Sequence, residues 1–257
     1  MKEVGSILKN SDPSKSPGFD GSRLLKEVAS EIPCPITDIF NKYLNSGIFR
    51  TKWKDSNLTP VFKSGQRDVV TNYRGIALLP VFSKVLERCV HSRILNMTEP
   101  YLSPSQHGFR RYRSCVTQLL QYVHNLATSL DAGEQVDNIY LDMEKAFDRV
   151  PHEKLLYKLE YLGFRNPLLH WVGDYLTNRR HRVSIDGISS DWKYVTSGVP
   201  QGSIIGPILF IIYINDIGSD LSPETLLPLY ADDAKCSRVI RGQLDRDILQ
   251  QHVSTLY

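Results

Sequence analysis

Hydrophobic positions recur at helical spacing in three stretches of the chain, at residues 82–95, 115–130 and 152–163, and each stretch is predicted to be a helix. Gly163 follows the last apolar position of the third stretch and is expected to end that helix. The apolar run GPILFIIYI at 206–214 is too short to cross a bilayer. It is therefore expected to be a buried helix or strand.

Segments with strand character lie between these helices. Residues 137–143 are predicted to form one strand, and residues 181–187 and 192–198 are predicted to pair as a hairpin that turns over GISSD. Because strands and helices interleave, the predicted fold class is α/β or α+β. The turn-rich stretch SDPSKSPGFDGS at 11–22 is expected to be a flexible entry segment.

The segment LLPLYADDAK at 226–235 places Asp232 and Asp233 side by side after an apolar run. Residues 228–240 are predicted to be a second hairpin with this pair in its turn, where both side chains can approach one ion. Two carboxylates about 4 Å apart repel by roughly 4 kcal/mol at an effective dielectric constant of about 20, so a cation is expected between them. A solvated turn is the alternative, because Asp favours turns.

A second acidic cluster follows the strand predicted at 137–143. In IYLDMEKAFD the apolar strand runs into Asp142, and Glu144 and Asp148 come next. Magnesium takes oxygen ligands and is usually held by one or two carboxylates plus substrate phosphates, so Asp142 and Asp232 on neighbouring strands would suffice. The alternative for Asp142 is a cap of the helix that follows. A metal-dependent phosphohydrolase would account for the same acids.

Composition changes this picture little. A hydrophobic content of 41% and a charged content of 23% are ordinary for a globular protein, and the net charge of +3 fits an anionic partner weakly. The four cysteines lie far apart with no CxxC pair, which argues against zinc and disulfides and favours an intracellular location, in the nucleus or the cytoplasm. The N-terminus lacks the apolar core of a signal peptide, and no membrane role is predicted.

The segment QHGFRRYRS at 106–114 is both basic and aromatic. It carries Arg110, Arg111 and Arg113 next to aromatic residues. Such clusters suit nucleic-acid phosphates and stacked bases, so the three arginines are predicted to contact nucleic acid. The alternative is a solvated charged face.

Four motifs in the order NYRGIALLPVFSKVLERCV, LDMEKAFD, SGVPQGSIIGPILFIIYINDI and YADD resemble the reverse transcriptase domain of non-LTR (LINE-type) retrotransposons, over about residues 45–240. Group II intron-type reverse transcriptases are the nearest alternative. The resemblance implies a right-hand polymerase, with fingers at about 1–135 and an incomplete palm at 136–257, and without a thumb or an endonuclease domain. The chain is therefore expected to be a fragment of such an element.

The resemblance also implies an activity. This is RNA-directed DNA polymerisation, in which deoxynucleoside triphosphates extend a DNA primer on an RNA template. The rival hypothesis is a catalytically inert nucleic-acid-binding remnant of the same element.

The resemblance assigns the metal site residue by residue. Asp142 and Asp232 are implied to hold two magnesium ions with the help of Asp233, and manganese is the expected substitute. Phe147 is implied to lie beneath the incoming sugar, where a rigid ring can exclude the 2′-hydroxyl of a ribonucleotide. Tyr230 of YADD is implied to contact nucleic acid.

The resemblance assigns the substrate contacts as well. Lys63 and Arg74 match the fingers residues that clasp the incoming triphosphate. Gln201 and Gly202 of VPQG match the loop that lies against the template and the nascent base pair. Gly75 departs from the family pattern, which usually has proline in NYRP, and is expected to loosen this strand.

Overall fold

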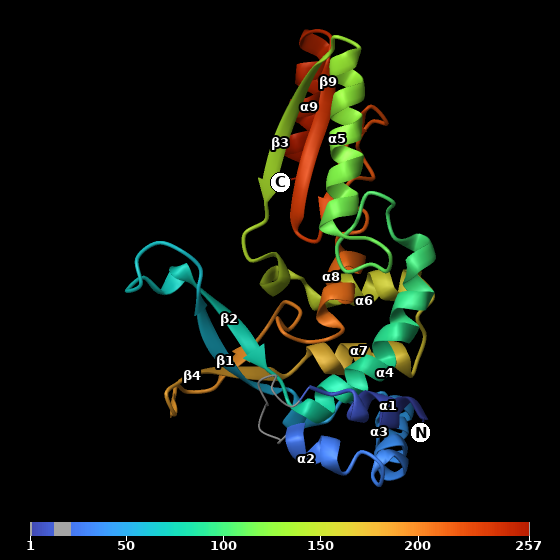
Figure 1. The fold of residues 1–257 in the computed structure, drawn as a ribbon, viewed down its shortest axis with the longest axis vertical. Helices are drawn as coiled ribbons and strands as arrows, with labels where there is room; N and C mark the ends of the chain where they lie inside the picture. The colour runs from blue at the N-terminus through green and yellow to red at the C-terminus, as the bar shows by residue number, and fades with distance from the viewer. Residues whose placement is uncertain (1, 13–21, 257) are drawn as a thin grey trace. The chain divides into compact units, whose positions relative to one another are not determined.

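Helices and strands interleave along the chain in the computed structural model, which describes residues 2–12 and 22–256 (Figure 1). The mixed α/β class predicted from the sequence is confirmed. Residues 13–21 of the stretch expected to be a flexible entry segment lie outside the described residues. Among the residues that are described, no helix is both long and apolar enough to cross a membrane.

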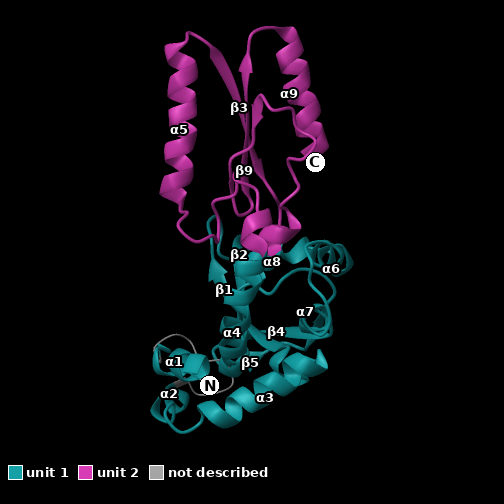
Figure 2. Ribbon diagram, turned by 90° about the vertical axis from the view of Figure 1, so that its right-hand side faces the viewer, with its two compact units in different colours: residues 1–97, 147–209 teal, residues 98–146, 210–257 magenta. Residues whose placement is uncertain are grey.

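The chain forms two compact units (Figure 2). Unit 1 comprises residues 1–97 and 147–209, and unit 2 comprises residues 98–146 and 210–257. Each unit therefore takes segments from both sides of the boundary at 135 and 136. The division into fingers and palm at that boundary stays a prediction.

Unit 1 contains a mixed sheet of five strands in the order β2-β1-β4-β5, with β6 paired to β4. β1 is antiparallel to β2 and parallel to β4. An aromatic cluster in the same unit includes Phe49, Trp171 and Tyr175, and all three rings are fully buried. The elements are α1 (Lys2–Lys9), α2 (Ser22–Glu27), α3 (Pro33–Ser46), β1 (Asp55–Phe62), β2 (Tyr73–Leu78), α4 (Val81–Thr98), α6 (His152–Tyr161), α7 (Leu168–Leu176), β4 (Arg179–Ile185), β5 (Ile188–Ser189) and β6 (Lys193–Val195).

Unit 2 contains an antiparallel sheet in the order β3-β9-β7, with β8 also paired to β9. The sheet lies between α5 and α9 (Figure 2). Side chains alternate between its two faces, so Leu141, Ala234 and Cys236 enter a core with Leu249 of α9, while Asp142 lies on the opposite face. The elements are α5 (Cys115–Asp131), β3 (Gln135–Asp142), β7 (Thr225–Leu226), β8 (Leu229–Tyr230), β9 (Asp233–Ile240) and α9 (Gln243–Leu256), and α8 (Gly206–Tyr213) has residues in both units.

The helices expected from the hydrophobic spacing are confirmed as α4, α5 and α6. α6 ends at Tyr161, two residues before Gly163, which has a φ of 92°. The apolar run at 206–214 is the buried helix α8.

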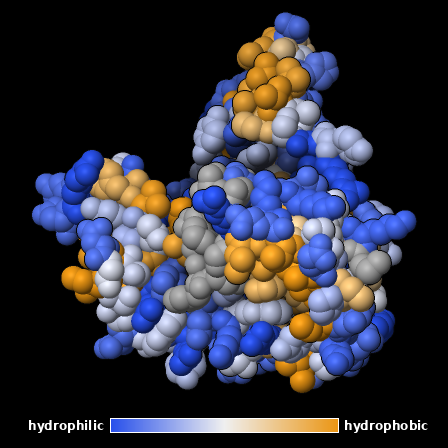
Figure 3. All heavy atoms as spheres, turned by 60° about the horizontal axis from the view of Figure 1, so that its bottom comes forward, coloured by the Kyte–Doolittle hydropathy of each residue, from blue (hydrophilic) through white to orange (hydrophobic). Residues whose placement is uncertain are grey.

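The hydrophobic face of α5 is covered only in part. Tyr122 is buried against the sheet and donates a hydrogen bond to Asn138 Oδ1 at 2.8 Å. Leu120 and Val123 of the same helix are exposed. Hydrophobic residues also reach the face drawn in Figure 3, where they form separate patches among hydrophilic ones.

The first predicted hairpin is confirmed, but its turn is not where it was expected. The turn lies at Asp186 and Gly187, which have φ values of 48° and 84°. Positive φ at both central residues is the two-residue turn that Asp-Gly favours. Ile188 and Ser189 of GISSD therefore belong to β5, and β6 pairs with the beginning of β4.

Candidate active site

Two of the predicted acids, Asp142 and Asp233, meet at one end of the sheet in unit 2. Asp142, the last residue of β3, is the cross-strand partner of Asp233, the first residue of β9. Directly opposed residues share a face of the sheet, so the two carboxylates lie on the same face. Asp232 and Ala231 form the turn between β8 and β9, and Tyr230 is the partner of Asp233 on the other side. The hairpin is confirmed, although Asp233 begins a strand rather than sharing the turn.

This end of the sheet opens into a cavity of about 260 Å³. Asp142 and Asp233 line it and are both exposed. Tyr230 and Tyr140 contribute aromatic surface, and Lys235 provides a cation. The lining thus combines carboxylates, one positive charge and flat aromatic side chains.

The donor set fits magnesium. Among the described residues there is no ready-made group of three or more His, Cys, Asp or Glu side chains for a metal. Magnesium does not require one, because it is usually held by one or two carboxylates together with substrate phosphates and water. Asp142 and Asp233 supply such a pair on one exposed face, and Asp232 stands next to it in the chain.

A row of hydrogen bonds in unit 1 joins three polar side chains. Arg74 Nε donates to Gln201 Oε1 at 3.0 Å, and Gln201 Nε2 donates to Asp148 Oδ1 at 3.0 Å. The amide of Gln201 is therefore fixed in one orientation by a cation on one side and a carboxylate on the other. Gln201 and Asp148 line a cavity of about 380 Å³ together with His181. Burial lowers the pKa of His181, and the nearby Asp148 carboxylate opposes that shift.

Lys63 and Arg74 belong to the hairpin of β1 and β2. Arg74 is paired with Val61, and Lys63 lies two residues beyond Val61, just past the end of β1. Both side chains are exposed. The structure therefore places both predicted phosphate ligands on one arm of unit 1, where an incoming anion can reach them.

Gly202 allows the VPQG loop to pack against β2. A Cβ at Gly202 would lie 2.6 Å from the carbonyl oxygen of Ala77, and the φ of Gly202 is 103°. Gln201 O also accepts a hydrogen bond from Ala77 N at 3.0 Å. The glycine thus serves a close approach to the protein's own backbone, in addition to any approach to a base. By contrast, a Cβ at Gly75 would meet Leu58 at an ordinary 3.5 Å, so space does not require that glycine.

Phe147 is buried, with 8% of its surface exposed, in the short 3-10 helix Ala146–Arg149. Its carbonyl oxygen accepts from Val199 N at 2.8 Å, and Gly198 N donates to Val150 O at 2.8 Å. These bonds tie the predicted sugar-contacting segment to the residues just before Gln201.

The basic segment at 106–114 divides into inward and outward arginines. The side chain of Arg110 is largely buried, donates to Glu99 Oε1 at 2.7 Å and also donates to Ser103 O at 2.7 Å. The protein itself therefore uses its guanidinium, which gives Arg110 a structural role. Arg111 is exposed, and Arg113 is partly exposed although its Nη1 also donates to Pro104 O and to His107 Nε2.

Glu87 of α4 was not expected from the sequence. It is fully buried, and its Oε2 accepts from Ile204 N at 2.7 Å and from Ile205 N at 3.3 Å. Its Oε1 accepts from Ser83 Oγ at 2.7 Å. Burial raises the pKa of Glu87, and these hydrogen bonds and the positive charge of Arg179 oppose that shift. Glu87 thereby holds the chain between the VPQG loop and α8.

The sequence gives no local sign of this role. In SKVLERC, Glu87 looks like an ordinary charged residue of a helix. Its partners Ile204 and Ile205 are 117 and 118 residues away.

A model of the reverse transcriptase (RNA-dependent DNA polymerase) family matches residues 61–256. The chain belongs to the reverse transcriptase family. The resemblance drawn from its four motifs is confirmed, because similar curated proteins include those of non-LTR retrotransposons of Drosophila.

Two relatives show the extent of the similarity. This reverse transcriptase chain is 31% identical over 244 residues to the RNA-directed DNA polymerase from mobile element jockey of Drosophila melanogaster. The aligned region covers 91% of this chain and 26% of the relative. It is 32% identical over 239 residues to the probable RNA-directed DNA polymerase from transposon X-element of the same organism. That aligned region covers 90% of this chain and 26% of the relative. The chain thus spans about a quarter of the length of these relatives.

Proposed function

We propose that this chain carries the polymerising site of an RNA-directed DNA polymerase, which adds deoxynucleotides to a DNA primer on an RNA template. The observation that carries the proposal is the meeting of Asp142 and Asp233 on one exposed end of a sheet, with Asp232 in the adjoining turn. Membership of the reverse transcriptase family supports the choice of reaction. The names fingers and palm for parts of this chain belong to the same proposal.

Asp142, Asp232 and Asp233 would hold two magnesium ions. When bound, the metal supplies activation of the primer 3′-hydroxyl and stabilisation of the leaving pyrophosphate, and manganese is the substitute. The carboxylates in turn have their mutual repulsion offset by the cations. Tyr230 on the neighbouring strand would contact the primer end.

The side chains of unit 1 would bind the nucleotide. Lys63 and Arg74 neutralise triphosphate charge, and Arg74 can engage a phosphate through two N–H groups. Gln201, whose amide is oriented by Arg74 and Asp148, lies against the nascent base pair together with Gly202. Which part of the nucleotide each of these side chains contacts is inferred from the resemblance to the family.

Nucleic acid would be held by charge. Arg111 is exposed and Arg113 is partly exposed, and these two arginines would contact template phosphates. Phosphate contacts make affinity depend strongly on salt. A catalytically inert remnant would share these contacts, but no observation on the described residues favours it.

Primer extension on a poly-rA template with an oligo-dT primer tests the proposal. Asp142→Asn and Asp232→Asn should each lower extension by about a thousandfold or more, because each removes a charged metal ligand. The folded state should survive, since each change also removes like-charge repulsion. The matched control is Asp137→Asn, the same substitution earlier on β3, which should leave extension unchanged.

Two results would count against the proposal. Extension by Asp142→Asn or Asp232→Asn at the wild-type rate would remove the metal assignment. Absence of any extension by the folded wild-type chain, with magnesium or manganese, would favour the inert remnant.

A further inference from the structure

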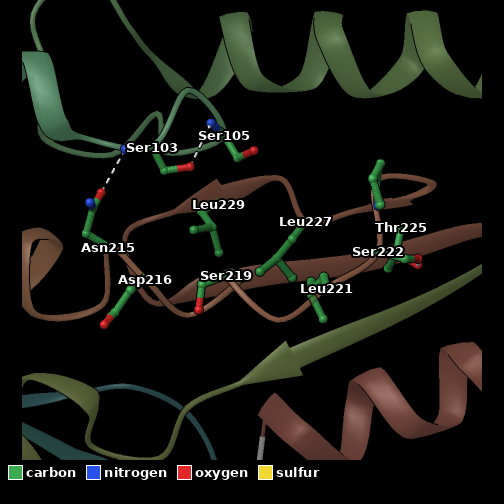
Figure 4. Close-up of a pocket in the computed structure, with 12 residues that line it drawn as sticks. Ser103, Ser105, Asn215, Asp216, Ser219, Leu221, Ser222, Thr225, Leu227 and Leu229 are labelled. Carbon is green, nitrogen blue, oxygen red and sulfur yellow. Dashed lines mark hydrogen bonds between the residues drawn. The ribbon is translucent and has the colours of Figure 1, made fainter.

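The segment from Ser105 to Phe109 lies against the strand that leads into the acidic turn of unit 2. Ser105 O accepts from Leu229 N at 2.9 Å, and His107 N donates to Leu229 O at 2.9 Å. Gln106 is thereby paired with Leu229 of β8 in a parallel bridge. Figure 4 shows Ser105 beside Leu229, and also shows Asn215, whose Oδ1 accepts a hydrogen bond from the backbone N–H of Ser103, two residues before Ser105.

The side chain of Gln106 grips the backbone of the turn itself. It is 1% exposed. Its Oε1 accepts from Ala231 N at 2.9 Å and from Gly108 N at 2.7 Å. Its Nε2 donates to Ala231 O at 3.3 Å. One side-chain amide therefore bonds both backbone polar groups of Ala231, the residue immediately before Asp232.

Ala231 needs such support. Its φ is 56°, a region that residues with a Cβ rarely adopt, and it is buried. Unusual backbone conformations of this kind persist only where the surroundings impose them. The double hydrogen bond from Gln106 is an interaction of that kind.

Gly108 provides an independent sign of the same contact. A Cβ at Gly108 would lie 2.4 Å from Ala231 N and 3.0 Å from Ala231 Cα. The two backbones therefore touch, and only glycine fits between them. The segment QHG therefore fits against the turn in two ways, through the amide of Gln106 and through the absence of a side chain at Gly108.

We propose that Gln106 is a positioning residue of the polymerising site, which acts on Asp232 and Asp233 by fixing the backbone of the turn that carries them. The proposal rests on the proposed function. Gln106 holds the conformation of Ala231, and the direction in which the next two side chains leave the backbone follows from that conformation. A displacement of reacting groups by about 1 Å can cost on the order of a hundredfold in rate.

Amide hydrogen exchange on the wild-type chain gives the first test, without substrate. The amides of Ala231 and Gly108 should be protected, because both donate to Gln106 Oε1. In Gln106→Leu, which keeps a similar volume without polar atoms, both amides should exchange about tenfold faster or more. Exchange of the wild-type Ala231 amide at the rate of an open turn would overturn the proposal, even if the leucine variant failed to fold.

Primer extension gives the second test. Gln106→Leu should lower kcat by about a hundredfold while the KM for deoxynucleotide changes by less than about threefold, since the turn is displaced but the nucleotide contacts remain. Asn215→Leu is the matched control, because Asn215 also uses its amide to bond backbone groups of this region, Ser103 N and Tyr101 O, but does not reach the turn. It should keep the wild-type kcat. An equal loss of kcat in both variants would overturn the proposal in favour of a general anchoring role.

A third variant, with a carboxylate in place of the amide, tests which hydrogen bonds of Gln106 protect the turn. Gln106→Glu keeps an acceptor for the amides of Ala231 and Gly108 but loses the donor to Ala231 O, so amide protection should largely return. If the wild-type chain shows no extension, the proposed function fails, and the exchange measurements still decide whether Gln106 fixes the turn.

Discussion

Two loops that carry the predicted chemistry are each held by one buried side chain from elsewhere in the same unit. In unit 2 the amide of Gln106 bonds Ala231 at the acidic turn. In unit 1 the carboxylate of Glu87 bonds Ile204 N and Ile205 N just after the VPQG loop. The task is the same, but the side chain in unit 2 is neutral and the side chain in unit 1 is an acid.

The difference follows from what each side chain has to hold. Ala231 offers both an N–H and a carbonyl, and a side-chain amide can accept from one and donate to the other, whereas an ionised carboxylate can only accept. A carboxylate there would also add negative charge beside Asp232 and Asp233. Ile204 and Ile205 contact Glu87 only through their N–H groups, and they lead into the N-terminus of α8, where negative charge is favourable.

Glu87 also has a countercharge that Gln106 does not need. Arg179 is 3% exposed and attracts Glu87 electrostatically. Its Nη1 donates to Tyr175 O at 3.0 Å, and Tyr175 in turn reaches Glu87 Oε2 at 3.4 Å. The backbone groups that Gln106 and Glu87 hold, with their polarity and the charges nearby, therefore decide which side chain is suitable at each place.

The largest expected effect comes from removing the buried carboxylate of Glu87. Glu87→Ala should lower the free energy of unfolding by about 3 kcal/mol or more, because it leaves the amides of Ile204 and Ile205 without their acceptor and Arg179 without its countercharge. Glu87→Gln, which keeps one acceptor oxygen, should cost about 1 kcal/mol. Urea denaturation of the chain measures both. A loss in Glu87→Ala no larger than that of an exposed substitution would show that the network carries little stability.

The stabilities of the wild type and of Glu87→Gln should also depend differently on pH. Burial raises the pKa of Glu87 above its ordinary value of 4.5, so the folded state binds this proton at pH values where the unfolded state has lost it. The contribution of Glu87 to stability is therefore full below 4.5 and is lost as the pH rises through the raised pKa. The stability difference between wild type and Glu87→Gln should shift toward the wild type as the pH falls. A difference that is constant with pH would contradict the raised pKa.

Gly202→Ala should have the next largest effect. The added Cβ would meet Ala77 O at 2.6 Å and would have to accept a φ of 103°. We expect a loss of about 2 kcal/mol in the free energy of unfolding and a rise in KM for deoxynucleotide, because the loop moves away from β2. Gly187→Ala, at a positive φ of 84° but with open space around the Cβ, is the control that isolates backbone strain. Equal losses in the two variants would show that packing against β2 is not the reason for Gly202.

Phe147→Val tests whether the segment joined to Val199 reads the sugar. If the ring excludes the 2′-hydroxyl, the preference for deoxynucleotides over ribonucleotides should narrow at least tenfold, which corresponds to about 1.4 kcal/mol of lost discrimination. Single-nucleotide incorporation with each substrate gives the two rates. A parallel loss of both activities, with selectivity unchanged, would mean that the buried ring of Phe147 is a packing residue.

The smallest expected effect concerns Gly75, where no clamp or close contact requires glycine. Gly75→Ala should raise the free energy of unfolding by about 0.5 kcal/mol, because the unfolded chain loses conformational freedom while the new Cβ meets Leu58 at an ordinary distance. Thermal unfolding of the two chains measures this. A loss of stability would indicate that the strand depends on the glycine, and the expected loosening would need another cause.

Local pattern in the sequence determined a large part of this protein. The spacing of hydrophobic residues predicted α4, α5 and α6, and the four ordered motifs predicted the family. The acids were also found, because strand residues that end in Asp142 and the pair in YADD are visible within short segments. The turn at Asp186 and Gly187 carried a local Asp-Gly signal as well, although the hairpin was predicted with a longer turn.

Only the tertiary structure decided how these segments are held. Gln106 lies 125 residues from Ala231, and Glu87 lies 117 residues from Ile204. A hydrogen bond across such a separation produces no local pattern in the sequence. From sequence alone, Gln106 and Glu87 cannot be distinguished from polar residues on an exposed surface. Burial and the direction of each backbone N–H and carbonyl decide which side chain is required, and both appear only when the distant segments meet.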